Sequence, residues 1–301
     1  MNTTVNIGLL AEEDSFTQNL SQKMEDKGEK AEFFTLKEIE IETSSPYRVI
    51  LDRMSYLDKF IRAYLKSQAL SGTYIINNPF AESTDDKFFQ YHLAKQLGVR
   101  IPKTILLPAA EPEYELGEIV REPNLSEVLK QIQLPAILKP FNGYGWRNVY
   151  KIESLEELEE IYQEKIDEIF LIQEYISYDH YVRAFVIGKK EILPVKYEPS
   201  SGGYIWHPKH LTKEEGNQII QACLKLNSVL DYDFNTVEFA IKEGQAYAID
   251  FRNTVPEILP EQIPAEYYQW ILEKLSDFLI ECVRNPRPVR YIWGETEHIV
   301  K

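Results

Sequence analysis

The sequence predicts an α/β protein, and three observations lead to that prediction. Short apolar segments alternate with amphipathic segments over the first 76 residues, which is typical of parallel strands joined by helices. An apolar run at residues 137–140 ends in Lys139-Pro140 and is followed by a glycine-containing turn. Further along, two β-rich segments around Glu238 and Asp250 flank a short turn, so we expect them to form a hairpin.

The composition is that of a globular protein large enough for two or three subdomains. The chain has 301 residues, 44% of them hydrophobic, and its formal net charge of −15 argues against non-specific binding of nucleic acid or anionic membranes. Cys223 and Cys282 show no metal-ligand spacing and fit a reducing compartment. Residues 1–14 lack a basic leader, and no apolar run approaches the roughly 18 residues of a membrane span. We therefore expect a cytoplasmic protein with neither a nucleic-acid nor a membrane partner.

The opening segment predicts a small domain with a parallel sheet. Its strands are expected at residues 5–10, 31–35, 47–52 and 74–76, and its helices at 14–27 and 54–70. No Gly-x-Gly-x-x-Gly turn follows the first strand, so we do not expect dinucleotide binding there.

Capping signals locate the later helices. A serine or threonine followed three residues later by an acidic residue predicts helix starts at Ser83, Ser154 and Thr212. The helices are expected to end at Gly98 and to cover residues 155–166 and 213–230, with a last helix at 265–284. The remaining segments are expected to form a strand at 103–107, a surface loop at 108–123 and a short strand around 290–293.

Lys139 is the first candidate site residue. A lysine at the end of a buried strand is a point cation that suits phosphate oxygens, and Gly143 and Gly145 let backbone amides approach a phosphate closely. The alternative is a surface lysine beside a proline, followed by an ordinary hairpin turn. The two glycines can serve both roles at once.

A second candidate group follows the apolar segment at 170–172. Gln173, Glu174, Tyr175 and Ile176 lie where extended backbone offers a carbonyl and an amide to an adenine edge, and Glu174 can accept a hydrogen bond from the exocyclic amine. Asp179 lies where it can hold a ribose hydroxyl. In the alternative interpretation, the glutamate is simply exposed at the end of a strand.

Arg183 is a charged residue on the otherwise apolar strand expected at 181–187, so it needs a partner. The partner is either the carboxylate of Glu238 or Asp250, in a structural ion pair, or a transferring phosphoryl group, which suits the geometry of a guanidinium. Lys196 precedes a loop rich in serine and glycine and is a second candidate for contact with phosphate.

Glu238, Asp250 and Asn253 form the last candidate group. A hairpin can bring residues about a dozen positions apart face to face. Two carboxylates and an amide oxygen are hard ligands that suit Mg²⁺ bridging nucleotide phosphates. The alternative is a hairpin whose carboxylates pair with Arg183 and Arg252.

In this order the motifs resemble those of the ATP-grasp superfamily, most closely the branch that holds glutathione synthetases and ribosomal-protein glutamate ligases. The matching motifs include Ile75-Ile76-Asn77-Asn78-Pro79, Asp86-Lys87, Lys139-Pro140, Gln173-Glu174-Tyr175 and Asp250-Phe251-Arg252-Asn253. The resemblance implies an N-terminal Rossmann-like domain at residues 1–82 and two α+β subdomains, at 83–170 and 171–301, that sandwich the nucleotide.

The resemblance also implies roles for single residues. Lys87 and Lys139 would bind the nucleotide phosphates, and Glu174 and Ile176 would hold adenine. Glu238, Asp250 and Asn253 would bind one or two Mg²⁺ ions, although the family often ends this motif with Glu-x-Asn, whereas two residues separate Asp250 from Asn253 here. Either the strand bulges or one of the two residues is not a ligand.

The implied activity is that of an ATP-dependent ligase. A carboxylate would be activated as an acyl phosphate and joined to an amine or a thiol, with release of ADP and phosphate. The partners would be a small-molecule or peptide carboxylate and an amine acceptor, with ATP and Mg²⁺ as cofactors. Two alternatives are a kinase for small molecules on the same fold and a non-catalytic nucleotide-binding protein. The oligomeric state is left open, a homodimer included.

Overall fold

The computed structural model describes residues 5–41, 43–81, 86–109, 122–143 and 147–288. The chain divides into two compact units. The first unit comprises residues 1–83, 180–239 and 250–301, and the second comprises 84–179 and 240–249. The predicted domain limits after residues 82 and 170 stay predictions.

The first unit contains the predicted parallel sheet. Its strands β1 (Ile7–Leu10), β2 (Ala31–Phe33), β3 (Val49–Asp52) and β4 (Tyr74–Ile76) are arranged in the order β2-β1-β3-β4, and every pair is parallel. Two helices, α1 (Ser15–Asp26) and α2 (Lys59–Leu70), connect these strands. The parallel strands and the two helices that the sequence predicts in this segment are therefore present.

Helix α2 begins later than the sequence predicts. The Asp52 carboxylate accepts hydrogen bonds from the backbone amides of Met54 (3.0 Å) and Ser55 (2.9 Å), which turns the chain immediately after β3. Asp58 then caps the helix by accepting from the amide of Phe60 at 2.6 Å. Two successive aspartate caps thus replace the expected first turn of helix with a polar turn.

A five-stranded sheet follows, with the order β11-β10-β9-β12-β13. Its strands are β9 (His180–Ile187), β10 (Glu191–Glu198), β11 (Gly203–Ile205), β12 (Phe234–Lys242) and β13 (Gln245–Asn253). The strand β11 lies in a segment that the sequence predicted as part of a loop. The hairpin of β12 and β13 is confirmed and is longer than expected.

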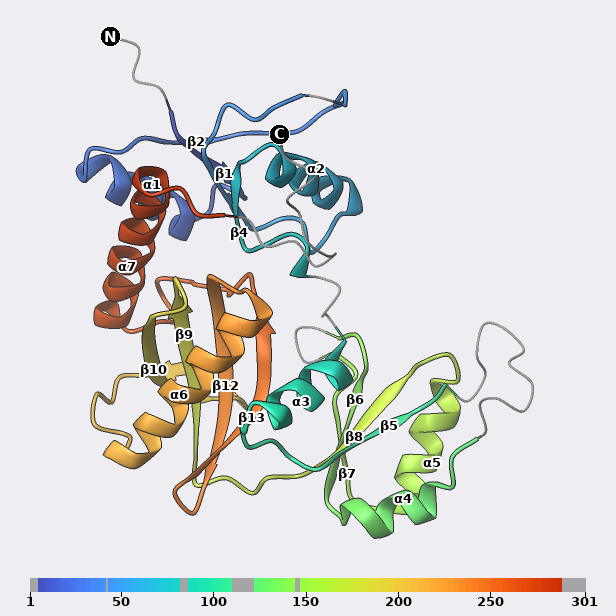
Figure 1. Ribbon diagram of the computed structural model, residues 1–301. Helices are drawn as coiled ribbons and strands as arrows, with labels where there is room; N and C mark the ends of the chain where they lie inside the picture. Colours follow the sequence, from blue (N-terminus) through green and yellow to red (C-terminus); the bar gives the residue numbers. More distant parts are fainter. Residues whose placement is uncertain (1–4, 42, 82–85, 110–121, 144–146, 289–301) are drawn as a thin grey trace. The chain divides into compact units, whose positions relative to one another are not determined.

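Two further helices complete the described part of the first unit: α6 (Lys213–Leu230) and α7 (Ala265–Arg284). The predicted capping box of α6 is present, with Thr212 and Glu215 bonded reciprocally. Helix α7 packs against α1 and β3 and also against β9 and β10, as Figure 1 shows for α1 and α7. One apolar core that includes Leu9, Phe185 and Phe278 therefore runs through the first unit.

The second unit is built on an antiparallel sheet with the order β5-β8-β6-β7. Its strands are β5 (Thr104–Leu107), β6 (Ala136–Pro140), β7 (Tyr150–Ile152) and β8 (Phe170–Glu174), and its helices are α3 (Lys87–Gln96), α4 (Leu125–Ile132) and α5 (Leu155–Glu164). Helices α4 and α5 contact each other, and they pack on β8 and β7 (Figure 1). Val128, Leu158 and Phe170 belong to their shared core.

Two helices of the second unit differ from expectation. Helix α3 begins at Lys87 because Asp86 itself is the capping residue and accepts from the amide of Phe89 at 2.5 Å. The predicted cap Ser83 lies outside the described residues, as do most of the 108–123 loop and the strand expected around 290–293. The sequence interpretation missed α4, although Asn124 caps an i, i+3, i+4, i+7 pattern of apolar residues there.

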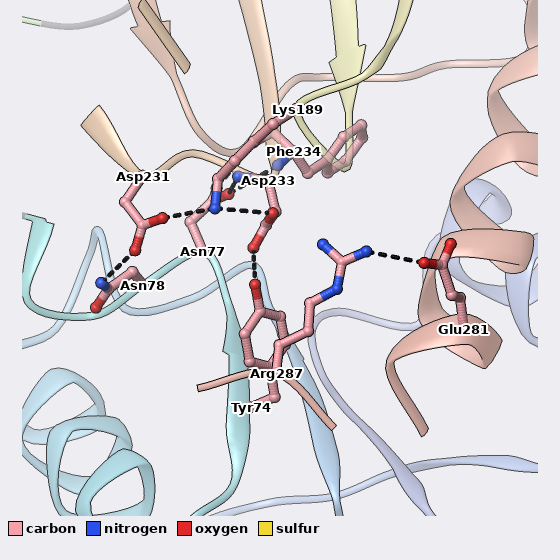
Figure 2. A network of polar contacts seen from close by, with 9 residues as sticks. All are labelled: Tyr74, Asn77, Asn78, Lys189, Asp231, Asp233, Phe234, Glu281 and Arg287. Carbon is pink, nitrogen blue, oxygen red and sulfur yellow. Dashed lines mark hydrogen bonds and ion pairs between the residues drawn. The ribbon is translucent and has the colours of Figure 1, made fainter. Parts of the chain in front are cut away.

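A buried polar network joins β4 to the loops of the five-stranded sheet within the first unit (Figure 2). The Tyr74 hydroxyl donates to Asp233 at 2.5 Å, and Lys189 pairs with Asp231 (2.5 Å) and Asp233 (3.2 Å). The Asn78 amide donates to Asp231 at 2.6 Å. Asp233 is only 1% exposed, so each of its contacts replaces water that burial has removed.

No helix in the described ranges is long and apolar enough to cross a membrane.

Candidate functional site

Lys139 lies at the end of β6, as the sequence predicts. Its side chain is buried, at 7% exposure. The ammonium donates to the Tyr91 hydroxyl at 2.6 Å and to the Ile249 carbonyl at 3.4 Å, and all three residues belong to the second unit. Residues from helix α3 and from β13 thereby fix the Lys139 ammonium at the end of β6.

Lys87 and the glycine turn meet beside this strand end. The Lys87 ammonium donates to the Gly143 carbonyl. A Cβ at Gly143 would lie 3.4 Å from the Pro140 side chain and 3.8 Å from the Lys87 ammonium, so the turn packs closely over both. The structure therefore brings together three predicted phosphate-contact sites, Lys87, Gly143 and the end of β6. Gly145 lies outside the described residues.

The residues predicted to hold adenine follow β8. The Gln173 amide donates to Thr104 at 2.7 Å and is buried, whereas Glu174 is exposed. The Glu174 carboxylate accepts from the backbone amide of Lys103 at 3.3 Å. From Tyr175 to residue 178 the chain leaves the strand ladder, with Ile176 buried at 5% exposure. The extended chain after β8 suits the predicted contacts with adenine, which stay predictions.

Asp179 has a structural task in the second unit. Its backbone amide donates to the Ile241 carbonyl at 2.7 Å, and its carboxylate accepts from the backbone amide of Glu243 at 2.8 Å. These bonds hold the turn between β12 and β13. The predicted contact between Asp179 and a ribose hydroxyl stays a prediction.

Arg183 and Glu238 form the ion pair that the sequence left as one of two alternatives. The Arg183 guanidinium donates twice to one oxygen of Glu238, with Nε at 3.0 Å, and the Tyr181 hydroxyl donates to the other oxygen at 2.7 Å. The guanidinium also donates to Tyr204 at 3.0 Å and lies 4.0 Å from the Tyr197 ring centroid. Burial is the largest single effect on the pKa of Arg183 and works to lower it, but Glu238, Tyr204 and Tyr197 together raise that pKa.

Lys196 is not brought to the side of the sheet that carries Arg183. In the register of β9 and β10, Val195 is opposite Arg183 and Lys196 is opposite Val182. Because neighbouring residues of a strand point to opposite faces, the side chains of Lys196 and Arg183 project from opposite faces. The two cations therefore cannot contact one phosphoryl group from the same face, and the phosphate contact of Lys196 stays a prediction.

Strand β13 separates the two metal candidates that it carries. Alternation places Asp250 with Arg252 on one face and Phe251 with Asn253 on the other, and Phe251 is 2% exposed. The Asp250 carboxylate accepts from the Arg252 backbone amide at 3.4 Å. Within the described residues it forms no ion pair, so the alternative of an Asp250–Arg252 salt bridge is not seen.

The carboxylates fit a metal that is shared with a nucleotide. Among the residues that the structure describes, no group of three or more His, Cys, Asp or Glu could hold a metal ion alone. Asp250 offers an unpaired carboxylate, and Glu238 keeps free lone pairs beside its bonds to Arg183 and Tyr181. One or two carboxylates completed by substrate phosphates are a common environment for Mg²⁺.

A polar pocket in the first unit was not predicted. It lies where β3, β4 and β13 end, and its lining includes Asp52, Ser55, Asn77, Asn78, Arg252 and Thr254. The sequence carried one signal, because polar residues directly follow the apolar strands β3 and β4. Ligands of parallel α/β sheets usually bind at the carboxyl ends of the strands.

Comparison with known proteins identifies the fold. No family model and no curated protein matches the sequence. A RimK domain ATP-grasp protein from Sphaerobacter thermophilus is 15% identical, with a TM-score of 0.67 over 91% of this chain and 99% of that one. A D-alanine–D-alanine ligase from Bacillus anthracis, in complex with ATP, is 17% identical, with a TM-score of 0.66 over 93% and 97%.

Structures with bound peptides are similar as well. The ATP-grasp ligase PsnB, complexed with a minimal precursor, Mg and ADP, is 14% identical, with a TM-score of 0.67 over 94% of this chain and 99% of PsnB. A RiPP-associated ATP-grasp ligase from Chryseobacterium gregarium, in complex with ADP and a leader and core peptide, is 16% identical, with a TM-score of 0.64 over 95% and 99%. The protein therefore has the ATP-grasp fold.

Proposed function

We propose that this protein is an ATP-dependent ligase that activates a carboxylate as an acyl phosphate and transfers the acyl group to an amine. The observation that carries the proposal is the meeting of Lys87 and Gly143 beside the buried Lys139. Two lysines and a close-packed glycine turn at one strand end provide cations and backbone amides for phosphate oxygens. The ATP-grasp fold supports the same reaction class by analogy.

Several of the predicted residues are assigned to ATP and Mg²⁺ as follows. Lys87 and Lys139 neutralise the phosphates of ATP, and the segment from Glu174 to Ile176 holds adenine. Asp250, with Glu238, would hold Mg²⁺, which supplies positive charge to the phosphate oxygens when it is bound. Asn253 projects from the other face of β13 and is left out of the ligand set.

Arg183 acts through Glu238 in the described structure. Its ion pair fixes the Glu238 carboxylate between a guanidinium and the Tyr181 hydroxyl. We therefore assign Arg183 as a positioning residue for Glu238. A direct contact between Arg183 and a phosphoryl group, the other alternative from the sequence, would require that ion pair to open.

The reaction has two steps. An oxygen of the substrate carboxylate attacks the γ-phosphorus, the bond to the bridging oxygen breaks, and ADP leaves. The amine nitrogen then attacks the acyl carbon, phosphate leaves with the electron pair of the broken C–O bond, and the nitrogen loses a proton. The protein contributes charge neutralisation and alignment, and the reaction requires no covalent protein nucleophile.

Two substitutions test the assignment. Lys139→Ala and Asp250→Asn are each expected to abolish ATP turnover, while the circular dichroism spectrum stays that of the folded protein. The first removes a cation that compensates the triphosphate, and the second removes a carboxylate proposed to hold Mg²⁺. Lys130→Ala and Asp167→Asn are matched controls on exposed positions of the second unit and are expected to keep full turnover. Full turnover in either Lys139→Ala or Asp250→Asn would contradict the proposal.

A product screen identifies the carboxylate substrate and the amine acceptor. Because two similar ligases are seen with peptides, the screen should include short peptides beside amino acids. Release of ADP and phosphate in equal amounts, with a condensed product in the mass spectrum, supports a ligase. ADP formation without free phosphate, with a phosphorylated product, would replace the ligase with a kinase.

A further inference from the structure

Tyr91 of helix α3 contacts the buried ammonium of Lys139 directly. The Tyr91 hydroxyl accepts a hydrogen bond from this ammonium at 2.6 Å, and the centroid of the Tyr91 ring lies 4.7 Å from the ammonium nitrogen. Tyr91 is 3% exposed and Lys139 is 7% exposed, so both groups have lost most of their contact with water. Tyr91 is not among the site residues that the sequence predicts.

The Tyr91 hydroxyl has a defined direction. It carries a single proton, which it donates to the Ile249 carbonyl, so the lone pairs of its oxygen face the Lys139 ammonium. The same carbonyl accepts from that ammonium at 3.4 Å. The three residues therefore form a closed triangle of hydrogen bonds, and all of them belong to the second unit.

Both acceptors in this triangle are neutral. They satisfy donors of the Lys139 ammonium without cancelling its charge, whereas the Lys189 ammonium in Figure 2 faces two carboxylates. A lysine is a point cation with rotatable donors on a flexible stem, so it has no preferred direction of its own. The Tyr91 hydroxyl and the Ile249 carbonyl supply that direction, and they add no negative charge that would compete with a phosphate.

Helix α3 reaches the end of β6 with two side chains on one face. Tyr91 follows Lys87 by four residues, which places both on the same side of the helix. The Lys87 ammonium donates to the Gly143 carbonyl. This glycine turn packs against Pro140, the last residue of β6. Lys87 thus contacts the turn after β6, and Tyr91 contacts the lysine at the end of the strand.

We propose that Tyr91 is a positioning residue for Lys139, whose hydroxyl holds the ammonium in the direction in which it meets a phosphate of ATP. This inference rests on the proposed function, in which Lys139 binds the nucleotide phosphates. Tyr91 contacts neither the nucleotide nor the reacting atoms in this assignment and acts through Lys139 alone. Fixing the ammonium before ATP binds lowers the entropy cost of the contact, so the hydroxyl favours nucleotide binding.

Tyr91→Phe tests the assignment, because it removes the hydroxyl and keeps a ring beside Lys139. Calorimetry of the 301-residue protein with Mg²⁺ and the non-hydrolysable ATP analogue AMPPNP is expected to give a dissociation constant about tenfold above that of the wild type. Steady-state kinetics should show the same increase in KM for ATP, with kcat changed by less than about threefold.

A double-mutant cycle separates an effect through Lys139 from a general effect on the fold. When Lys139→Ala is already present, adding Tyr91→Phe is expected to change the dissociation constant of the analogue by less than about twofold. Tyr150→Phe is the matched control. Tyr150 is opposite Leu138 in the register of β6 and β7, so its ring lies on the other face of the sheet from Lys139. This variant is expected to bind the analogue like the wild type.

Three outcomes would overturn the inference: Tyr91→Phe binds the analogue like the wild type, it weakens binding equally with and without Lys139, or it lowers kcat at an unchanged KM, as a smaller folded fraction would. Failure of the proposed function is detected separately, as absence of Mg-dependent ATP turnover in the wild type. If the wild type turns over ATP while Tyr91→Phe leaves analogue binding unchanged, the ligase assignment stands and the positioning role is wrong.

Discussion

Two charged regions of the first unit differ in whether their charged side chains are paired with each other. In the network of Figure 2, Lys189 faces Asp231 and Asp233, and Asp233 also receives the Tyr74 hydroxyl. In the polar pocket at the ends of β3, β4 and β13, Arg252 and Asp52 line one space, and among the described residues they form no ion pair with each other. Both regions lie beside β4, since Asn77 and Asn78 contact the network and line the pocket.

The difference separates structural charges from functional ones. A buried charge with a partner is compensated, so its removal leaves the partner stranded and lowers stability. A charge that the fold leaves without a partner contributes little or negatively to stability and is kept for another reason, such as a ligand. Substitution of a paired charge is therefore expected to lower the free energy of unfolding, whereas substitution of an unpaired charge is expected to leave it unchanged or raise it.

The largest expected effect is on the network side. Asp233→Ala leaves the Tyr74 hydroxyl without its acceptor and removes one of the two carboxylates paired with Lys189, so the free energy of unfolding is expected to fall by about 1–3 kcal/mol. Chemical denaturation monitored by circular dichroism measures the change, with Asp167→Ala as the exposed control. A loss below about 1 kcal/mol would show that the network does not stabilise the first unit.

Arg53→Met tests a buried cation next in sequence to Asp52, a lining residue of the pocket. The substitution removes a guanidinium whose described contacts are a hydrogen bond to the Pro256 carbonyl and a position 5.2 Å from the Phe16 ring centroid, and it keeps an unbranched chain of similar length. Because desolvation of the charge is no longer needed, the free energy of unfolding is expected to rise by about 1 kcal/mol. A fall of several kcal/mol on denaturation would place Arg53 among the structural charges.

An exposed ion-pair cluster is expected to contribute to stability by an amount between those of the two regions. Glu273 pairs with Lys23 at 2.6 Å and Lys27 at 2.8 Å, joining α7 to α1, and hydrogen bonds from these lysines lower the pKa of Glu273 to about 2. Its side chain is 45% exposed, so Glu273→Gln is expected to cost less than about 1 kcal/mol at neutral pH.

The contribution of Glu273 to stability is expected to decrease as the pH falls. A carboxylate whose pKa is depressed in the folded state stabilises the protein above its unfolded pKa of about 4.3 and loses that contribution as the pH falls. The stability difference between wild type and Glu273→Gln should therefore shrink between that pH and about 2. Denaturation curves at several pH values measure it, and a difference that grows on acidification would contradict the assignment.

The smallest expected stability effect is that of Arg252→Gln. Because the Arg252 side chain has no described polar partner, the free energy of unfolding is expected to change by no more than about 0.5 kcal/mol. Thermal unfolding without ligand measures this change. A clear loss of stability would mean that Arg252 has a structural partner after all.

Local patterns predicted much of this fold. The alternation of strands and helices in the first 76 residues, the capping box at Thr212 and the hairpin around Glu238 depend on residues close in sequence, and the structure has them all. Helix α4 was not predicted although Leu125, Val128 and Ile132 carry its pattern. The segment between the loop predicted at 108–123 and the apolar run at 137–140 was left unassigned.

Sites built from distant segments could not be predicted in the same way. The face on which Lys196 projects depends on the turn at Gly188 and Lys189, where both residues have positive φ and set the register of β10 against β9. The pocket combines residues 52–81 with Tyr232 and residues 252–255, and no spacing within one segment predicts contact with the others. The position of Lys139 was predictable, whereas its contact with Tyr91 required the packing of α3.

The central claim is tested most directly by the stoichiometry of the reaction. The 301-residue protein with Mg²⁺, ATP, a carboxylate substrate and an amine acceptor is expected to release ADP and phosphate in a one-to-one ratio, together with an amide product. The release should require the carboxylate substrate, vanish in Lys139→Ala and persist in Lys130→Ala. ADP formation that is independent of any carboxylate substrate, or equal product formation by Lys139→Ala, would contradict the account.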